Sequence, residues 1–238
     1  MIEPLLADDT FLADVESARG EPGLHIWWLG QSGFLVQHEG RHLAIDPYLS
    51  DALTRKYAET ATPHMRLTRR VVAPERLGFV DVALSTHGHG DHLDEETLRG
   101  IGAPLVAAAG TVELARERSG VDVTGIAEGQ AVERAGFRVE AVPAVHPGGH
   151  CVGYVLAAGR YRLYHSGDTT WLDPGVRRVD VAFVPVNGKR DNLDGPEGAR
   201  LAHTVGAGLA VPCHYDMFEF NTATPDAFTA ECDRLGQP

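Results

Sequence analysis

The stretch Ser85-Thr86-His87-Gly88-His89-Gly90-Asp91-His92 decides how this chain folds and what it can do. It directly follows the apolar run 80–84, which has the composition of a buried strand. Side chains two residues apart on an extended chain point to the same side, so His87 and His89 can face one ion. Asp91 and His92 follow where the chain turns, and they can face a second ion beside the first. Imidazole and carboxylate are the usual ligands of zinc and related divalent metals at catalytic sites.

Three more candidate ligands follow predicted strands in the second half of the chain. They are His146 after residues 136–145, Asp168 in the turn after residues 161–165, and His214 after residues 209–213. Any one of them alone would be weak evidence, since single histidines and Gly-Asp turns are common. Together with the first loop they complete two sets of ligands. We assign one metal to His87, His89 and His146, a second metal to Asp91, His92 and His214, and a bridging role to Asp168. Three protein ligands with open positions are typical of a catalytic metal site.

Length and composition limit the class of protein. With 238 residues and 43% hydrophobic content, the chain can bury one substantial core, so we expect a single domain over residues 1–238. No apolar run approaches the roughly 20 residues that span a bilayer, and acidic residues stand where a secretory signal has basic ones. We therefore expect a soluble, cytoplasmic protein with no membrane partner. The formal net charge of −12 argues against a nucleic-acid partner.

The three cysteines do not form a disulfide framework. Their number is odd, and no two of them are spaced as C-x-x-C. We interpret Cys151, Cys213 and Cys232 as small buried side chains.

The order of the predicted elements indicates an α+β fold. Residues 8–18 have apolar residues at helical spacing, and residues 24–29, 34–37 and 42–45 predict an antiparallel meander. The remaining predicted strands are 104–109, 123–126, 130–133, 136–145, 153–157, 161–165, 179–186 and 209–213, and the remaining predicted helices begin after Asp94 and at Thr111, Pro196 and Pro225. Strands followed by helices, twice over, predict two similar halves, about 22–120 and 121–238. The two sheets would pack face to face with helices outside them.

Residues 47–78 show no clean periodicity. A long irregular segment in a compact domain is often a functional lid or wall, and a solvated surface loop is an equally good interpretation. Trp27, Trp28 and this segment could supply an interface for a homo-oligomer, but the sequence leaves the oligomeric state open.

Substrate contacts are harder to predict than metal ligands. His150 follows a flexible Pro-Gly-Gly turn near His146 and can contact substrate, with a surface or packing role as the alternative. Asn187, Lys189 and Arg190 follow the strand 179–186, and their basic groups suit an anionic substrate. An ordinary solvated basic turn explains the same residues. His165 is a candidate hydrogen-bond donor behind the metal ligands, or simply a strand-end histidine. We interpret the remaining histidines as structural or exposed: His25, His38, His42, His64 and His203.

These motifs resemble those of the metallo-β-lactamase superfamily, from Trp28 to the C-terminus. Within it, four stretches resemble the ascorbate-6-phosphate lactonase-like group: residues 28–34 (WLGQSGF), 45–51 (IDPYLSD), 166–169 (SGDT) and 212–218 (PCHYDMF). The resemblance implies a four-layer αββα sandwich with the metals at one edge of the sheets. It also implies that Asp46 supports the metal loop from behind, as hydrogen-bond partners of ligating histidines commonly do. The flavodiiron branch of this fold has an acidic residue where this chain has His89, which favours hydrolysis over oxygen reduction.

The expected activity is therefore that of a metal-dependent hydrolase. Two neighbouring cations lower the pKa of a shared water so that hydroxide is available near neutral pH, and Asp91 is suited to orient it and carry its proton. The leading expectation is a lactonase-like or esterase-like enzyme acting on a small anionic molecule. The alternatives are a phosphodiesterase or nuclease of the same fold, and a non-catalytic binding protein on this scaffold. General ligand chemistry points to Zn²⁺, while the lactonase resemblance points to Mn²⁺.

Overall fold

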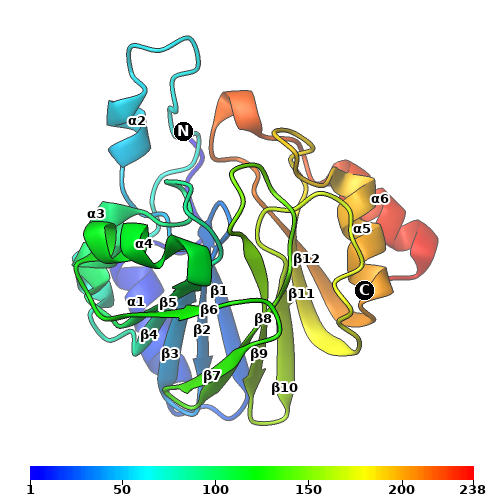
Figure 1. Cartoon of the computed structure of the whole chain (residues 1–238), viewed down its shortest axis with the longest axis horizontal. Coiled ribbons are helices and arrows are strands. Elements are labelled where there is room, and N and C mark those ends of the chain that lie inside the picture. The colour runs from blue at the N-terminus through cyan, green and yellow to red at the C-terminus, as the bar shows by residue number, and fades with distance from the viewer.

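Two six-stranded sheets pack face to face in the structure, a computed structural model that describes residues 1–238 (Figure 1). The first sheet has the order β1 (Leu24–Gly30), β2 (Gly33–His38), β3 (Arg41–Ile45), β4 (Val82–Ser85), β5 (Leu105–Ala108) and β6 (Val123–Ile126). Strands β1 to β3 form the predicted antiparallel meander, and β3 to β6 run parallel. The parallel strands therefore end at the same edge of the sheet.

The second sheet repeats this arrangement in the reverse spatial order. Its strands are β12 (Ala207–Cys213), β11 (Val179–Pro185), β10 (Tyr161–His165), β9 (Val152–Ala158), β8 (Phe137–Pro143) and β7 (Ala131–Arg134). Strands β7 to β10 are antiparallel, and β10 to β12 are parallel. The predicted αββα sandwich is confirmed.

Strand β6 belongs to the first sheet, whereas the sequence indicated the second. We placed residues 123–126 at the start of the second half, but β6 pairs in parallel with β5. The intervening helix α4 (Val112–Ser119) makes the crossover that a parallel pair requires. The change from one sheet to the other therefore falls between Ile126 and Ala131, not at residue 120.

Helices cover the outer faces of both sheets (Figure 1). α1 (Asp8–Ala18), α3 (Glu95–Ile101) and α4 lie against the first sheet, and α5 (Gly195–Thr204) and α6 (Asp226–Leu235) lie against the second. The start of α5 is capped from both sides, because Asp194 accepts from the Glu197 amide at 2.8 Å and Glu197 accepts from the Asp194 amide at 3.1 Å. None of the helices combines the length and hydrophobicity that a membrane-spanning helix needs.

The largest cluster of buried apolar side chains lies between the two sheets. Phe34 of β2 and Phe183 of β11 meet there, with their ring centroids 4.1 Å apart. The Tyr154 hydroxyl of β9 donates to the Ser85 carbonyl of β4 at 2.8 Å. This bond ties the sheets together where β4 leads into the His/Asp loop.

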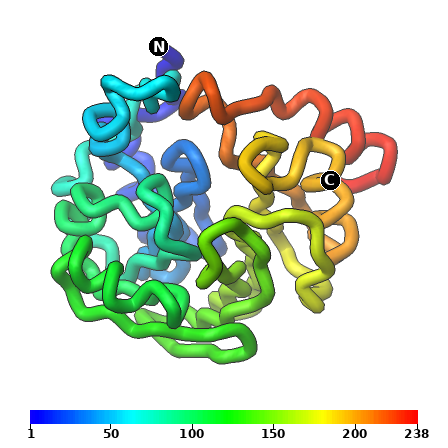
Figure 2. Tube along the Cα trace, turned by 45° about the horizontal axis from the view of Figure 1, so that its top comes forward, coloured from blue at the N-terminus to red at the C-terminus, as the bar shows by residue number.

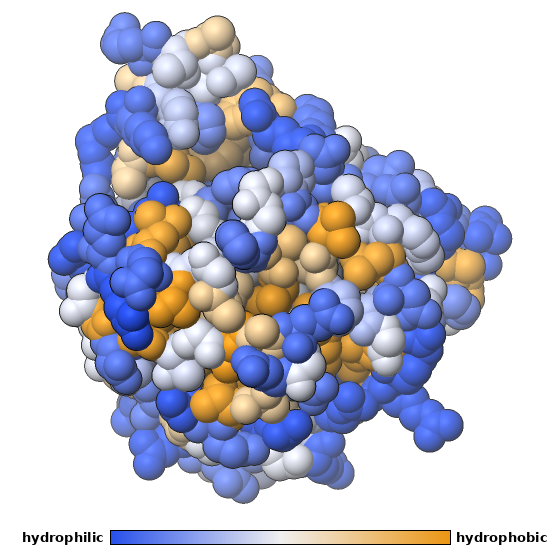
Figure 3. Space-filling model, in the orientation of Figure 1, coloured by the Kyte–Doolittle hydropathy of each residue, from blue (hydrophilic) through white to orange (hydrophobic).

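The irregular segment 47–78 contains α2 (Ala52–Lys56) and the short 3-10 helix η1 (Pro74–Leu77). Its α2 part projects above the sheets in Figure 1 and at the upper left of the space-filling view (Figure 3). The buried guanidinium of Arg66 donates to the Ser50 carbonyl at 2.9 Å and lies over the Tyr48 ring at 4.9 Å. These contacts attach the base of the segment to the body of the protein. Two further 3-10 helices are η2 (Ala109–Thr111) and η3 (Glu219–Asn221).

Candidate metal centre

The seven predicted ligands all follow strands that end at one edge of the sandwich. His87, His89, Asp91 and His92 follow β4, His146 follows β8, Asp168 follows β10 and His214 follows β12. Figure 2, which brings the top of the molecule forward, shows segments from the blue-to-green and the yellow-to-red parts of the chain around this edge. Residues far apart in the sequence therefore meet at one place.

The ligand atoms form three overlapping groups. In each group they lie within 4.8 Å of one another: His87, His89 and His146; His87, His92 and Asp168; and Asp91, His92 and His214. The first and third groups are the two ligand sets expected from the sequence. Asp168 lies between them, because its Oδ1 is 3.3 Å from His92 Nε2 and its Oδ2 is 3.1 Å from His214 Nε2.

The atoms that face the centre of the cluster are suited to hold divalent metal ions. His87 Nε2, His92 Nε2 and Asp168 Oδ1 are buried and have no hydrogen-bond partner within the protein. Buried polar atoms without partners are costly, and a bound cation removes that cost. Nitrogen and oxygen ligands in this combination suit zinc and related metals.

Hydrogen bonds on the outer side of the cluster orient three of the imidazole rings. His92 Nδ1 donates to Asp46 Oδ2 at 2.7 Å, and His87 Nδ1 donates to the Thr86 hydroxyl at 3.1 Å. His146 Nδ1 is 3.4 Å from the Asp191 carbonyl. Fixing Nδ1 as the donor leaves Nε2 as the atom that can bind a metal.

Asp46 is fully buried behind the His/Asp loop. Its Oδ1 accepts from the Thr86 amide at 2.8 Å, and its Oδ2 accepts from the Thr86 hydroxyl at 2.6 Å as well as from His92. Asp46 therefore holds both the backbone of the loop and one ligand ring. This is the position that the family resemblance implied for it.

Gln31 is a site residue that the sequence analysis did not identify. It lies in the turn between β1 and β2, and its amide nitrogen is 2.7 Å from Asp91 Oδ2 and 3.1 Å from His214 Nε2. The only signal in the sequence was its position in the WLGQSGF stretch.

The electrostatics of the cluster favour cations. Burial lowers the pKa of His87 well below its ordinary value, and desolvation also lowers the pKa values of His89 and His146, so these rings are neutral and able to bind metal. Burial opposes charge on His92 and His214 as well, but the carboxylates of Asp168 and Asp91 raise the pKa values of both rings. In the metal-free protein these two rings attract protons, which bound cations would replace.

A cavity of about 410 Å³ opens onto the ligands. His89, Asp91, His146, Asp168 and His214 line its polar side. Another part of its wall is largely aromatic: Tyr57 stacks on His64 at 4.1 Å, and His64 lies 4.5 Å from Phe220 and 5.1 Å from Phe218. The same cavity therefore offers a molecule both the metal ligands and an aromatic wall.

The position of His64 differs from our prediction. We interpreted His64 as structural or exposed, yet it lines this cavity together with Leu53 and Tyr57 of the same segment. Part of residues 47–78 therefore forms a wall of the cavity, one of the two interpretations left open. Aromatic contacts with Phe218 and Phe220, far away in the sequence, bring His64 there.

Of the four predicted substrate residues, the structure brings only Arg190 to the cavity. Asn187 is buried and donates to Asn221 at 2.9 Å, and Lys189 donates to the Phe220 carbonyl at 3.3 Å, so both hold the loop in place. His150 is exposed and does not line the cavity, and its ring packs over Gly110. The cavity also takes in Asn192 and Asn221, which the sequence analysis did not single out.

His165 lies one layer behind the ligands. Its Nε2 donates to the Ser32 carbonyl at 2.9 Å, and its Nδ1 accepts from the Gly167 amide at 3.1 Å. The ring thus connects the Gln31 turn to the loop that carries Asp168.

Comparison with known proteins identifies relatives along most of the chain. The family model described as "Beta-lactamase superfamily domain" matches residues 41–215. A UPF0173 metal-dependent hydrolase of Methanopyrus kandleri is 31% identical over 90% of this chain and 93% of its own length. One of Thermoplasma acidophilum is 29% identical over 90% of this chain and 92% of its own length.

Solved structures share the fold at lower identity. Igni18, a metallo hydrolase from Ignicoccus hospitalis, superposes with a TM-score of 0.67 at 22% identity, over 89% of this chain and 91% of that chain. An isothiocyanate hydrolase from Delia radicum gut bacteria superposes with a TM-score of 0.70 at 17% identity, over 89% of this chain and 92% of that chain. At these identities the likeness concerns the fold alone.

Proposed function

The chain belongs to the beta-lactamase superfamily and is a metal-dependent hydrolase, and from this premise we propose that it hydrolyses an ester or lactone bond of a small anionic molecule at a two-metal site. The first metal would be held by His87, His89 and His146, and the second by Asp91, His92 and His214, with Asp168 between them. Zn²⁺ is the expected ion because it suits these ligands, and Mn²⁺ is the alternative.

The observation that carries the choice of substrate is the position of Arg190. This arginine is exposed, has no acidic partner within ion-pair distance and lines the same cavity as the ligands. Its guanidinium lies 5.2 Å from the centre of the Phe220 ring, which limits the directions in which it can point. A cation next to the reacting centre favours a substrate that carries a carboxylate or phosphate group.

Different residues of the site would perform different parts of the hydrolysis. Bound divalent cations would lower the pKa of water and polarise the bond under attack. Asp91 is partly buried and faces the cavity, so its carboxylate can orient that water and accept its proton. Gln31 fixes the direction of this carboxylate. The aromatic wall of Tyr57, His64 and Phe220 excludes bulk water from one side of the substrate.

The resemblance to the ascorbate-6-phosphate lactonase-like group supports a lactone or a related ester as the bond cleaved. The alternative of a phosphodiesterase or nuclease uses the same cations for an in-line displacement. The net charge of −12 disfavours a nucleic-acid substrate. A binding protein without catalysis is disfavoured because all seven ligand positions are filled by ligand residue types.

Metal analysis and a substrate screen test the proposal together. The protein, purified with its native metal and after loading with Zn²⁺ or Mn²⁺, is assayed on lactones, sugar phosphate esters and bis-p-nitrophenyl phosphate. We expect up to two ions per chain and turnover of an anionic lactone or ester. Arg190→Ala should raise KM for the anionic substrate about tenfold with little change in kcat, whereas Lys189→Ala should leave KM unchanged. Turnover of the phosphodiester alone, or an absence of bound metal, would refute the proposal.

A further inference from the structure

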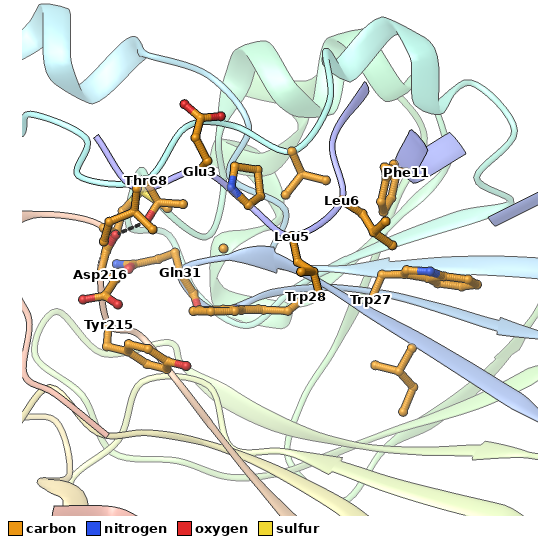
Figure 4. Close-up of a pocket in the computed structure, with 16 residues that line it drawn as sticks. Glu3, Leu5, Leu6, Phe11, Trp27, Trp28, Gln31, Thr68, Tyr215 and Asp216 are labelled. Atoms are coloured by element: carbon orange, nitrogen blue, oxygen red, sulfur yellow. Dashed lines mark hydrogen bonds between the residues drawn. The ribbon is translucent and has the colours of Figure 1, made fainter. Parts of the chain in front are cut away.

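A second cavity, of about 420 Å³, lies under the N-terminal segment 2–6, next to the edge strand β1 (Figure 4). Its volume is within the range of small-molecule sites. Ten of its sixteen lining residues are hydrophobic, so an apolar molecular surface fits most of its wall. Gln31 lines this cavity and also contacts Asp91, so one side chain separates the cavity from the candidate metal centre.

The two ends of this cavity differ in character. Figure 4 shows Leu6, Phe11 and Trp27 at one end, and Gln31, Asp216 and Thr68 at the other. A ligand that matches both ends must have an apolar body and a polar head group.

The charge of the polar end is negative. No Lys, Arg or His lines the cavity, and its two acidic residues are Glu3 and Asp216. Glu3 is already paired with Arg69 at 2.7 Å. Asp216 is half-buried, and its carboxylate has neither an ion-pair partner nor a hydrogen bond from another side chain. Asp216 therefore offers an unsatisfied negative charge beside an apolar wall.

The backbone of Asp216 is held firmly in this position. Its amide donates to the Thr222 hydroxyl at 2.7 Å, and its carbonyl accepts from the Thr68 hydroxyl at 2.6 Å. Its φ of 53° lies in the left-handed region, which Asp and Asn tolerate better than most residues. The backbone that carries the carboxylate is thus held in place by two hydrogen bonds.

Two aromatic rings in the wall favour an organic cation. The rings of Trp28 and Tyr215 lie 4.8 Å apart in the wall, and aromatic faces attract organic cations. Trp28 is held by its own bond from Nε1 to the Gln31 carbonyl at 2.9 Å.

We propose that this cavity is a second ligand site, separate from the metal centre, and that it takes an amphipathic primary amine. The ammonium group would pair with Asp216. The apolar body would lie along Trp28 and reach towards Leu6 and Phe11. An anionic or purely apolar molecule of the same size leaves the carboxylate unpaired.

Calorimetric titration of the metal-loaded protein tests this proposal with two probes of similar size and opposite charge. We expect 2-phenylethylamine to bind once per chain and 3-phenylpropionate to bind at least about tenfold more weakly. Asp216→Asn should weaken amine binding about tenfold, because it removes the charge and keeps the shape and the backbone conformation. Leu6→Trp should also reduce amine binding, because the larger ring fills the apolar end.

The matched control is Glu219→Gln. Glu219 is exposed, has no ion pair and lies outside the cavity lining, so its replacement lowers the net negative charge by the same amount without touching the site. It should leave amine affinity unchanged. Equal affinity for the amine and the carboxylate, unchanged amine binding by both Asp216→Asn and Leu6→Trp, or no amine binding at millimolar concentration would each overturn the proposal. Circular dichroism of each variant identifies a loss of folding.

Discussion

The side-chain amide of Gln31 lies 2.7 Å from Oδ2 of Asp91, although the two residues are 60 positions apart in the sequence. A residue outside the His/Asp motif thus fixes the direction of the carboxylate that is proposed to handle the proton. Because the same amide is 3.1 Å from His214 Nε2, it also limits how that ring can turn. The turn between β1 and β2 is therefore part of the candidate metal centre.

Replacing Gln31 should affect both metal binding and catalysis. We expect Gln31→Leu to lower metal affinity or kcat by roughly 10- to 100-fold, the range typical of residues that orient ligands. Equilibrium dialysis with metal analysis measures the first quantity, and steady-state kinetics measures the second. Gln37→Leu is the control, since Gln37 is a buried glutamine that bonds the Ala18 carbonyl away from the ligands. Normal metal content and normal kcat in Gln31→Leu would show that the contact has no role.

Asp91→Asn should preserve the fold but remove most of the turnover. The amide keeps the shape of the side chain, but it cannot accept the proton, so we expect kcat to fall roughly 10²- to 10⁴-fold. The exposed Asp122, replaced in the same way, should leave kcat unchanged. Full activity of Asp91→Asn, with the melting temperature intact, would exclude the assigned role.

Removal of the metals should destabilise the protein. Ions that bind only the folded state add stability by mass action, about 2.7 kcal/mol at a concentration of 100 Kd. For a chain of this length we expect dialysis against EDTA to lower the melting temperature by roughly 5–10 °C. Added Zn²⁺ or Mn²⁺ should restore it. Identical melting curves with and without metal would contradict the inference that the buried, unpartnered ligand atoms bind metal ions.

Tyr154→Phe tests the link between the two sheets. The variant loses the hydroxyl that donates to the Ser85 carbonyl, and this leaves a buried carbonyl less well satisfied. We expect a loss of about 1–2 kcal/mol, seen as a melting temperature that is lower by roughly 2–8 °C. Tyr161→Phe is the control. It removes a hydroxyl whose hydrogen bond comes from the exposed side chain of Arg160, so it should change the melting temperature little.

The contribution of Glu231 should depend on pH. Hydrogen bonds from Arg234, followed by those from Arg200, lower the pKa of Glu231 from 4.5 to about 2. A lowered carboxyl pKa stabilises the fold above the unfolded value of 4.5, and this stability is lost as the pH falls through the folded value. Glu231→Gln should therefore lower the melting temperature slightly at pH 7, and the difference from wild type should shrink between pH 4.5 and 2. If the difference in melting temperature between wild type and Glu231→Gln is constant from pH 4.5 to 2, the stabilisation by Glu231 does not come from its charge.

Much of the fold could be predicted because its strands carry their own signal. Apolar runs bounded by glycine turns located β1 to β3, and polar ligands at the strand ends indicated the edge where they meet. The sheet to which β6 belongs could not be predicted, because a strand of four residues does not specify its neighbour.

The walls of the metal cavity could be predicted less well than the ligands. The ligand types and their spacing are chemical signals in themselves, whereas His64 and Gln31 reach the site through contacts with residues far away in the sequence. Nothing in the residues around His64 distinguishes it from a surface histidine. Arg190 was singled out because a basic group follows a strand end, a signal it shares with Lys189, whose side chain turns away to the Phe220 carbonyl.

The ligands come from loops of both sheets, and this has a consequence for how the protein is made. His214 lies near the C-terminus, after β12, while the first ligands follow β4. A nascent chain on the ribosome therefore lacks a complete second ligand set until residues beyond β12 have been made. The assigned second set of ligands therefore cannot be assembled before the second sheet is complete.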